Sequence, residues 1–207
     1  AFSLEATNCV IDKYGRIGSR KGWTKATATN ADLGTATVDT LSELVTNDGT
    51  RYLIAAGNNF LFLFASGTLT KLTYGGGGVA PTITASNWKS AMLNGVLVLF
   101  QIGHDPLIFE PSVSTTTYRR LSERVGYTGT VLLANTAVSA YGRIWCASTT
   151  ADKNTVQWCD TIAPGAWTAG SSGTLNLLGV WPQGGDEIIS LAAHNNFLVI
   201  FGRKQTL

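Results

Sequence analysis

Hydrophobic and polar residues alternate along this chain in short runs, without the longer period of a helix. Seven runs of four to seven residues are rich in β-branched, aromatic and leucine side chains and are bounded by Asn, Asp, Gly or Ser. They predict strands at residues 51–55, 60–65, 96–102, 107–110, 143–148, 156–160 and 197–202. Residues 89–93 are too short for a convincing helix, and residues 41–45 fit a strand as well as a helical turn. The pattern therefore predicts an all-β protein.

The predicted strands recur in four units that share one plan. Each unit has a short strand, a polar or glycine-containing turn, an apolar strand, a second loop and a further strand, which the last unit lacks. Steps of 46, 47 and 54 residues separate the matching turn positions Gly49, Gly95, Gly142 and Asn196. Periods of about 40 to 50 residues with several strands per unit are typical of β-propeller blades. A β-sandwich is the structural alternative, but it shows no fixed step, so we predict four-stranded antiparallel, propeller-like blades.

Turn chemistry supports this division. The pairs Asp48-Gly49 and Asn94-Gly95 favour tight hairpin turns in which both central residues have positive φ. Residues 97–100 and 198–201 are apolar throughout, as expected of strands that are covered on both faces. Residues 69–72 and 117–121 would supply fourth strands.

The first forty residues differ from the repeats. Residues 1–40 form a predicted N-terminal segment that leads into the propeller, with a turn at residues 12–16, and residues 41–207 form a partial propeller of four units. The chain stops within the fourth unit, which is therefore unfinished. We expect the chain to be a fragment of a longer protein whose further residues complete the ring.

Composition narrows the classes of function. Hydrophobic residues make up 44% of the 207 and charged residues only 14%, with a net charge of +2. So small a charge does not draw a protein strongly to nucleic acid or to a membrane surface. No apolar run approaches the roughly 18 residues of a membrane-spanning helix. A surface poor in charge suits faces that meet other subunits, although secreted β proteins share this composition.

Three cysteines are too few, and odd in number, for a disulfide framework. Cys146 and Cys159 each follow a tryptophan, which predicts a hairpin whose two arms carry a Trp-Cys pair. We expect both to be buried thiols, and reduced cysteines fit assembly in a cytoplasm.

The candidate chemical motifs have simpler structural interpretations. Tyr74 and the four glycines after it lack the Gly-Lys-Ser/Thr of a phosphate loop, so residues 74–78 are predicted to be a flexible linker between blades. His104-Asp105 precedes a proline and His194 precedes two asparagines, so both are predicted to lie in turns. Three basic pairs are predicted to be scattered surface charge: Arg20-Lys21, Arg119-Arg120 and Arg203-Lys204. We predict no catalytic residue, no cofactor and no metal site.

Several strings nevertheless match a family as a set: ATNCVIDKYGRIGSRKG at 6–22, YGRIW at 141–145, VQWCD at 156–160, PGAW at 164–167, GDEIIS at 185–190 and FLVIFG at 197–202. Together they resemble the tail tubular, nozzle and head-stabilisation proteins of short-tailed bacteriophages. The resemblance implies a propeller-containing subunit that assembles, commonly as a hexamer, around the channel through which the genome leaves. It brings no catalytic residues.

We therefore expect a structural, non-enzymatic virion protein of the tail nozzle, tail tube or head–tail connector, assembled in the host cytoplasm. Its expected partners are further copies of itself in a hexameric ring and adjacent portal, adaptor or tail proteins, while DNA passes without sequence-specific binding. The alternative is a propeller-type binding module that recognises a host-surface glycan or receptor through loop aromatics such as Trp167 and Trp181. A hydrolase would need carboxylates and arginines clustered at one mouth of the propeller, and the thirteen acids are dispersed.

Overall fold

Most strands pair with their sequence neighbours in antiparallel hairpins and so form separate sheets, which confirms the all-β prediction. The computed structural model describes residues 9–11, 13–19, 26–84 and 88–207. The first sheet has the order β3-β4-β5-β6, the second β7-β11-β10-β9-β8, the third β12-β13-β14-β15, and the fourth unit pairs β16 with β17. The strands are β3 (Thr40–Val45), β4 (Arg51–Gly57), β5 (Phe60–Ala65), β6 (Thr68–Lys71), β7 (Thr73–Tyr74), β8 (Lys89–Leu93), β9 (Val96–Phe100), β10 (Leu107–Phe109), β11 (Thr117–Arg120), β12 (Thr136–Ala140), β13 (Arg143–Ala147), β14 (Thr155–Trp158), β15 (Gly173–Asn176), β16 (Ile188–His194) and β17 (Phe197–Gly202).

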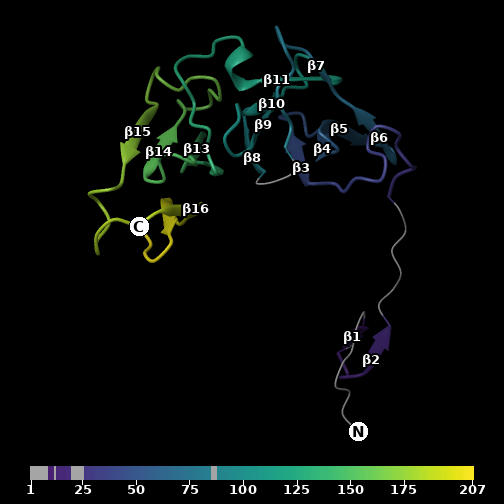
Figure 1. Cartoon of the computed structure of the whole chain (residues 1–207), viewed down its shortest axis with the longest axis horizontal. Helices are drawn as coiled ribbons and strands as arrows, with labels where there is room; N and C mark the ends of the chain where they lie inside the picture. Colours follow the sequence, from purple (N-terminus) through teal and green to yellow (C-terminus); the bar gives the residue numbers. More distant parts are fainter. Residues whose placement is uncertain (1–8, 12, 20–25, 85–87) are drawn as a thin grey trace.

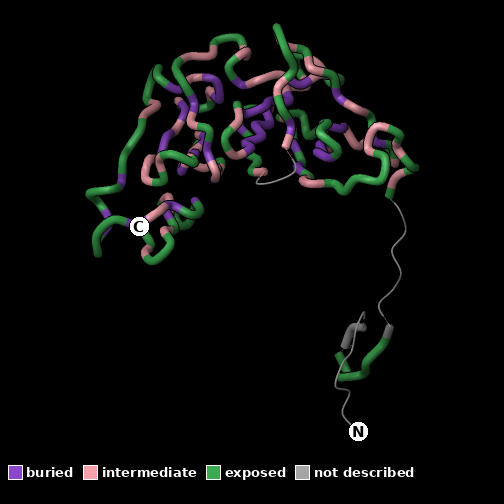
Figure 2. The backbone as a smooth tube through the Cα atoms, in the orientation of Figure 1, coloured by how far each residue is buried: buried purple, intermediate pink, exposed green. Residues whose placement is uncertain are grey.

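The sheets stand side by side in an arc that does not close (Figure 1), and β12 packs against both β8 and β16. Buried residues gather within this arc and exposed residues follow the loops (Figure 2). All five residues of β9 are buried: Leu97 and Leu99 belong to the core shared with the first sheet, and the other three to the core shared with the third. Full burial of such a side chain contributes roughly 1.5–3 kcal/mol. The blades are propeller-like, as predicted, and their mutual packing forms the core.

Hairpin turns show where the predicted turn chemistry is correct and where it is wrong. Asn94 and Gly95 have φ of 50° and 73°, as a two-residue turn between twisted strands requires. Between β3 and β4, however, the chain forms a five-residue loop, and of Asp48-Gly49 only Gly49 has positive φ. The Asp48 carboxylate stabilises this wider loop by accepting hydrogen bonds from the Thr50 amide (3.1 Å) and hydroxyl (3.0 Å).

The first and third sheets are four-stranded, as predicted, while the second differs in strand number. β7 adds a parallel strand beside β11, so the second sheet has five strands. The third sheet gains β15, which the sequence did not predict, and β11 ends at Arg120 because Leu121 begins the short 3-10 helix η1 (Leu121–Glu123). In the fourth unit the last residues fold back along β17, where Ile200 and Leu207 exchange backbone hydrogen bonds of 2.8 and 2.9 Å.

Ahead of the blades, residues 26–39 run as a strap over the outer face of the first sheet. Leu33 packs on a small core formed by Ala55, Phe62 and Leu69, and Asp32 forms an ion pair with Lys71 at 2.5 Å. Further towards the N-terminus, β1 (Cys9–Ile11) and β2 (Ile17–Ser19) form a hairpin that lies apart from the blades in Figure 1. The segment before β3 therefore does more than lead into the propeller, since it covers an apolar sheet face.

Candidate functional site: the anchored linkers between blades

The linker after β6 is held firmly, contrary to the prediction that residues 74–78 are flexible. Tyr74 pairs with Tyr118 in the parallel register of β7 and β11, and the amide of Gly75 donates to the Tyr118 carbonyl at 2.8 Å. Close packing explains the glycine at position 76, because a Cβ there would lie 2.1 Å from a carboxylate oxygen of Glu123. The glycines therefore allow the linker to pack against the second blade.

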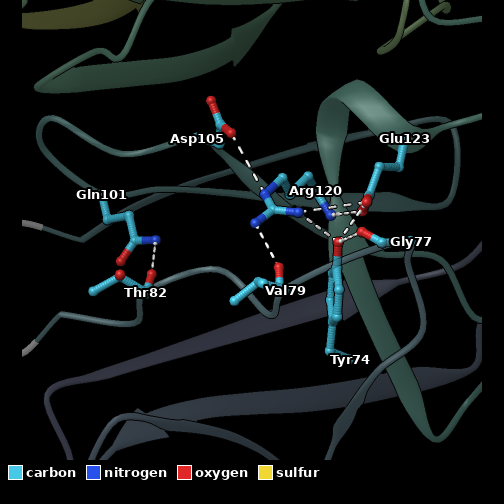
Figure 3. Close-up of polar contacts among 8 residues, drawn as sticks. All are labelled: Tyr74, Gly77, Val79, Thr82, Gln101, Asp105, Arg120 and Glu123. Carbon is cyan, nitrogen blue, oxygen red and sulfur yellow. Dashed lines mark hydrogen bonds and ion pairs between the residues drawn. The ribbon is translucent and has the colours of Figure 1, made fainter.

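A polar cluster around Arg120, beside η1, holds this linker in place (Figure 3). The guanidinium donates to the Tyr74 hydroxyl at 2.6 Å and to the Val79 carbonyl at 2.8 Å, and lies 3.5 Å from a carboxylate oxygen of Asp105. The Tyr74 hydroxyl also hydrogen-bonds the Glu123 carboxylate. One arginine thus joins the linker to the loop before β10 and to the turn after β11.

Electrostatics follow from this geometry. Burial and the hydrogen bond with Glu123 raise the pKa of Tyr74 to about 12. Burial alone would raise the pKa of Glu123, but hydrogen bonds from Tyr74 and from the Arg120 amide, with the charge of Arg120, outweigh it and lower that pKa. At neutral pH Tyr74 is therefore a neutral phenol and Glu123 a carboxylate, beside the guanidinium of Arg120. Hydrogen bonds among these three groups hold the linker against the second blade.

Buried glutamines hold the linkers at two further points. Gln101 is 1% exposed; its Oε1 accepts from the Thr84 amide at 3.0 Å and its Nε2 donates to the Thr82 carbonyl at 2.7 Å, the contact drawn in Figure 3. Gln157 is 4% exposed and binds the next linker in the same way, with the Leu132 amide and the Thr130 carbonyl both at 2.8 Å. Each side-chain amide pairs with one donor and one acceptor of a linker backbone in a partly buried position.

In the fourth unit Gln205 likewise bonds one amide and one carbonyl of a linker, in exposed contacts. Its Oε1 accepts from the Gln183 amide at 2.8 Å and its Nε2 donates to the Gly184 carbonyl at 3.0 Å. Nearby, the Asp186 carboxylate accepts from the amides of Glu187, Lys204 and Gln205 at 2.8 to 2.9 Å. Sequence reasoning missed these glutamines, although the 48-residue step from Gln157 to Gln205 was an available signal.

The tryptophans proposed for ligand contact are buried, so that prediction is wrong. Trp167 is 1% exposed and Trp181 is 5% exposed. Each indole N–H already has a partner, the Pro164 carbonyl at 3.0 Å for Trp167 and the Asn154 side chain at 3.1 Å for Trp181. These rings belong to the cores between blades and present no face to a glycan.

The next candidates from the sequence are the cysteines. Cys146 and Cys159 are free and buried, as predicted, and lie on or just after β13 and β14, which form the predicted hairpin. Their burial raises the pKa of both thiols. The side chain of Cys9, and the pair Arg20-Lys21, lie outside the described residues.

Histidines and basic pairs show no shared site. His104 lies in the turn after β9, as predicted, whereas His194 is the last residue of β16 and pairs with Phe197. Arg119 and Arg120, expected as scattered surface charge, are partly buried and form ion pairs, Arg119 with Glu110 at 3.5 Å. Within the described ranges, no group of three or more His, Cys, Asp or Glu side chains could hold a metal ion, and no helix is long and apolar enough to cross a membrane.

Comparison with known proteins adds no family. Neither a scan against protein-family models nor a search of curated proteins returns a match to this chain. Function must therefore be argued from the fold and from the linker anchors.

Proposed function

We propose that this chain is a structural, non-enzymatic part of a tailed-phage virion, built into the tail nozzle, tail tube or head–tail connector. The observation that carries the proposal is that residues of the phage-like strings hydrogen-bond to one another and to Ser171 at one end of the third blade. Arg143 donates to the carbonyls of Cys159 (3.1 Å) and Ser171 (2.5 Å). Asp160 accepts from the Ser171 amide at 2.9 Å. These hydrogen bonds hold the end of the third blade together.

The anchored linkers support the same role. A subunit that surrounds a DNA channel must keep its shape while the genome passes. At each junction between units a glutamine side chain hydrogen-bonds the linker backbone; these bonds are partly buried at the first two junctions and exposed at the third. The sparse charge is suited to packing between subunits. We propose a ring-like homohexamer that contacts portal, adaptor or other tail proteins and lets DNA pass without sequence-specific binding.

Antibody labelling of virions together with mass measurement of the full-length protein tests this function. We expect label at the tail or at the head–tail junction, and a mass that is a whole multiple of one subunit. Unlabelled virions and a protein that is monomeric at every concentration would refute it. The alternative, a module that binds a glycan or receptor, was based on exposed Trp167 and Trp181. Both side chains are buried, so they cannot form that binding surface.

A further inference from the structure

An open hollow of about 390 Å³ lies where the first and second blades meet. The loop between β3 and β4 forms one wall, and the turn between β8 and β9 with the loop after β10 forms the other; its lining includes Asn47, Asp48, Tyr52, Gly95 and Ser112. Its volume falls within the roughly 300–1,000 Å³ of small-molecule sites. Between the second and third blades, by contrast, the turn after β8 is bridged to the next blade, because the Asn94 side chain donates to the Ile162 carbonyl at 3.2 Å.

Several polar groups of the hollow have no hydrogen-bond partner among the residues that the structure describes. Among the described residues, the Tyr52 hydroxyl, the Asn47 side-chain amide and the Ser112 hydroxyl form no hydrogen bond. The Tyr52 ring is nevertheless held in place by edge contact with Phe109, with ring centroids 5.5 Å apart. An ordered aromatic ring with a polar tip offers an apolar surface and a hydrogen bond to the same ligand.

Asp48 gives the hollow its charge. Hydrogen bonds from the Thr46 side chain and from the Thr50 amide and side chain lower the pKa of this carboxyl, so it is ionised at neutral pH. They also hold it in a fixed orientation on the loop. A fixed carboxylate accepts hydrogen bonds strongly from hydroxyl donors and repels an anion.

We propose that this hollow binds one unit of a neutral sugar. The Tyr52 ring packs against the apolar face of the sugar ring, while Asp48 and Asn47 accept hydrogen bonds from its hydroxyls, and Ser112 completes the rim. The proposal does not depend on the role in a virion, because a sugar unit of a cell-surface glycan and a free hexose present the same chemistry.

Titration of the isotope-labelled full chain, followed by nuclear magnetic resonance, tests the site. The probes are glucose, galactose, mannose and N-acetylglucosamine, with N-acetylneuraminic acid as the anionic comparison. We expect at least one neutral sugar to shift the amide resonances of Asp48, Gly49 and Gly95 with an affinity on the order of 1 mM, and the acidic sugar to leave them unchanged. An oligosaccharide of the same sugar that binds more tightly than the free hexose identifies a glycan chain as the ligand, and equal binding identifies the free sugar.

Two variants and a matched control localise the effect. Tyr52→Phe keeps the ring and removes the hydroxyl, and should weaken binding about five-fold; Asp48→Asn should weaken it about ten-fold. Asp152→Asn is the control, because Asp152 accepts the same kind of hydrogen bonds from Asn154 and Thr155 in a loop that does not line the hollow. No shift with any neutral sugar, equal binding of the acidic sugar, or unchanged affinity in both variants would overturn the proposal.

Discussion

Replacing Gln157 by leucine tests whether the amide brackets hold the blades together. The change keeps an apolar side chain of similar size but removes both hydrogen bonds to the linker, from the Leu132 amide and to the Thr130 carbonyl. Each lost bond costs about 1 kcal/mol, and a buried group left unpaired costs about 1–3 kcal/mol. Since leucine recovers part of the loss through apolar burial, we expect the free energy of unfolding to fall by about 2–4 kcal/mol.

Urea denaturation followed by tryptophan fluorescence measures this change, and hydrogen exchange locates it. We expect the Leu132 amide to lose its protection while amides in the first sheet keep theirs. Gln183→Leu is the matched control, since the Gln183 side chain is exposed and should change stability by less than about 0.5 kcal/mol. Equal effects of the two substitutions would refute the reasoning, because the bracket would then contribute nothing beyond a surface glutamine.

Three further predictions concern the strap, the linker cluster and the thiols. Gly57→Ala should destabilise the fold by about 1–3 kcal/mol in urea denaturation, because its Cβ would lie 2.6 Å from the Thr37 carbonyl oxygen. Glu123 has a pKa below its usual value of 4.5, so its stabilisation is present above that value and is lost as pH falls through the lower pKa; the stability difference between wild type and Glu123→Gln should therefore shrink in acid denaturation series. Cys146 and Cys159 should resist a thiol reagent in the native protein and react only on unfolding, as their raised pKa values and burial require.

Each of these has its own control. Gly179→Ala introduces a Cβ with no neighbour within 4 Å, so a loss as large as that of Gly57→Ala would show that steric contact is not the cause. A stability difference for Glu123→Gln that grows as pH falls would contradict the direction of its pKa. Thiol measurements use a Cys9→Ser background, and labelling of native protein at the rate of unfolded protein would contradict the burial of both thiols.

Sequence patterns predicted the apolar strands more accurately than the strands at the edges of the sheets. Residues 60–65 and 197–202 form strands with the predicted bounds, because runs covered on at least one face have a distinctive composition. β15 was missed because its residues are mostly exposed and only hydrogen bonds to β14 hold it. β7 has two residues, too few to show any period, and its parallel pairing depends on a neighbour more than forty residues away.

The linker anchors and the hollow were harder to foresee. Gln101 and Gln157 look like surface residues until the fold brings a linker backbone to each. Trp167 and Trp181 looked exposed because they lie in loops, yet both loops fold back into cores between blades. The hollow combines residues from the loop after β3 and the loop after β10, so only the packing of two blades reveals it.

An electron cryomicroscopy map of the virion that carries the full-length protein tests the central claim most directly. The account predicts identical copies in a ring around the DNA channel, each with these sheets packed side by side and their linkers held by Gln101, Gln157 and Gln205. A map of the tail and head–tail junction that accounts for every subunit without these blades would contradict it.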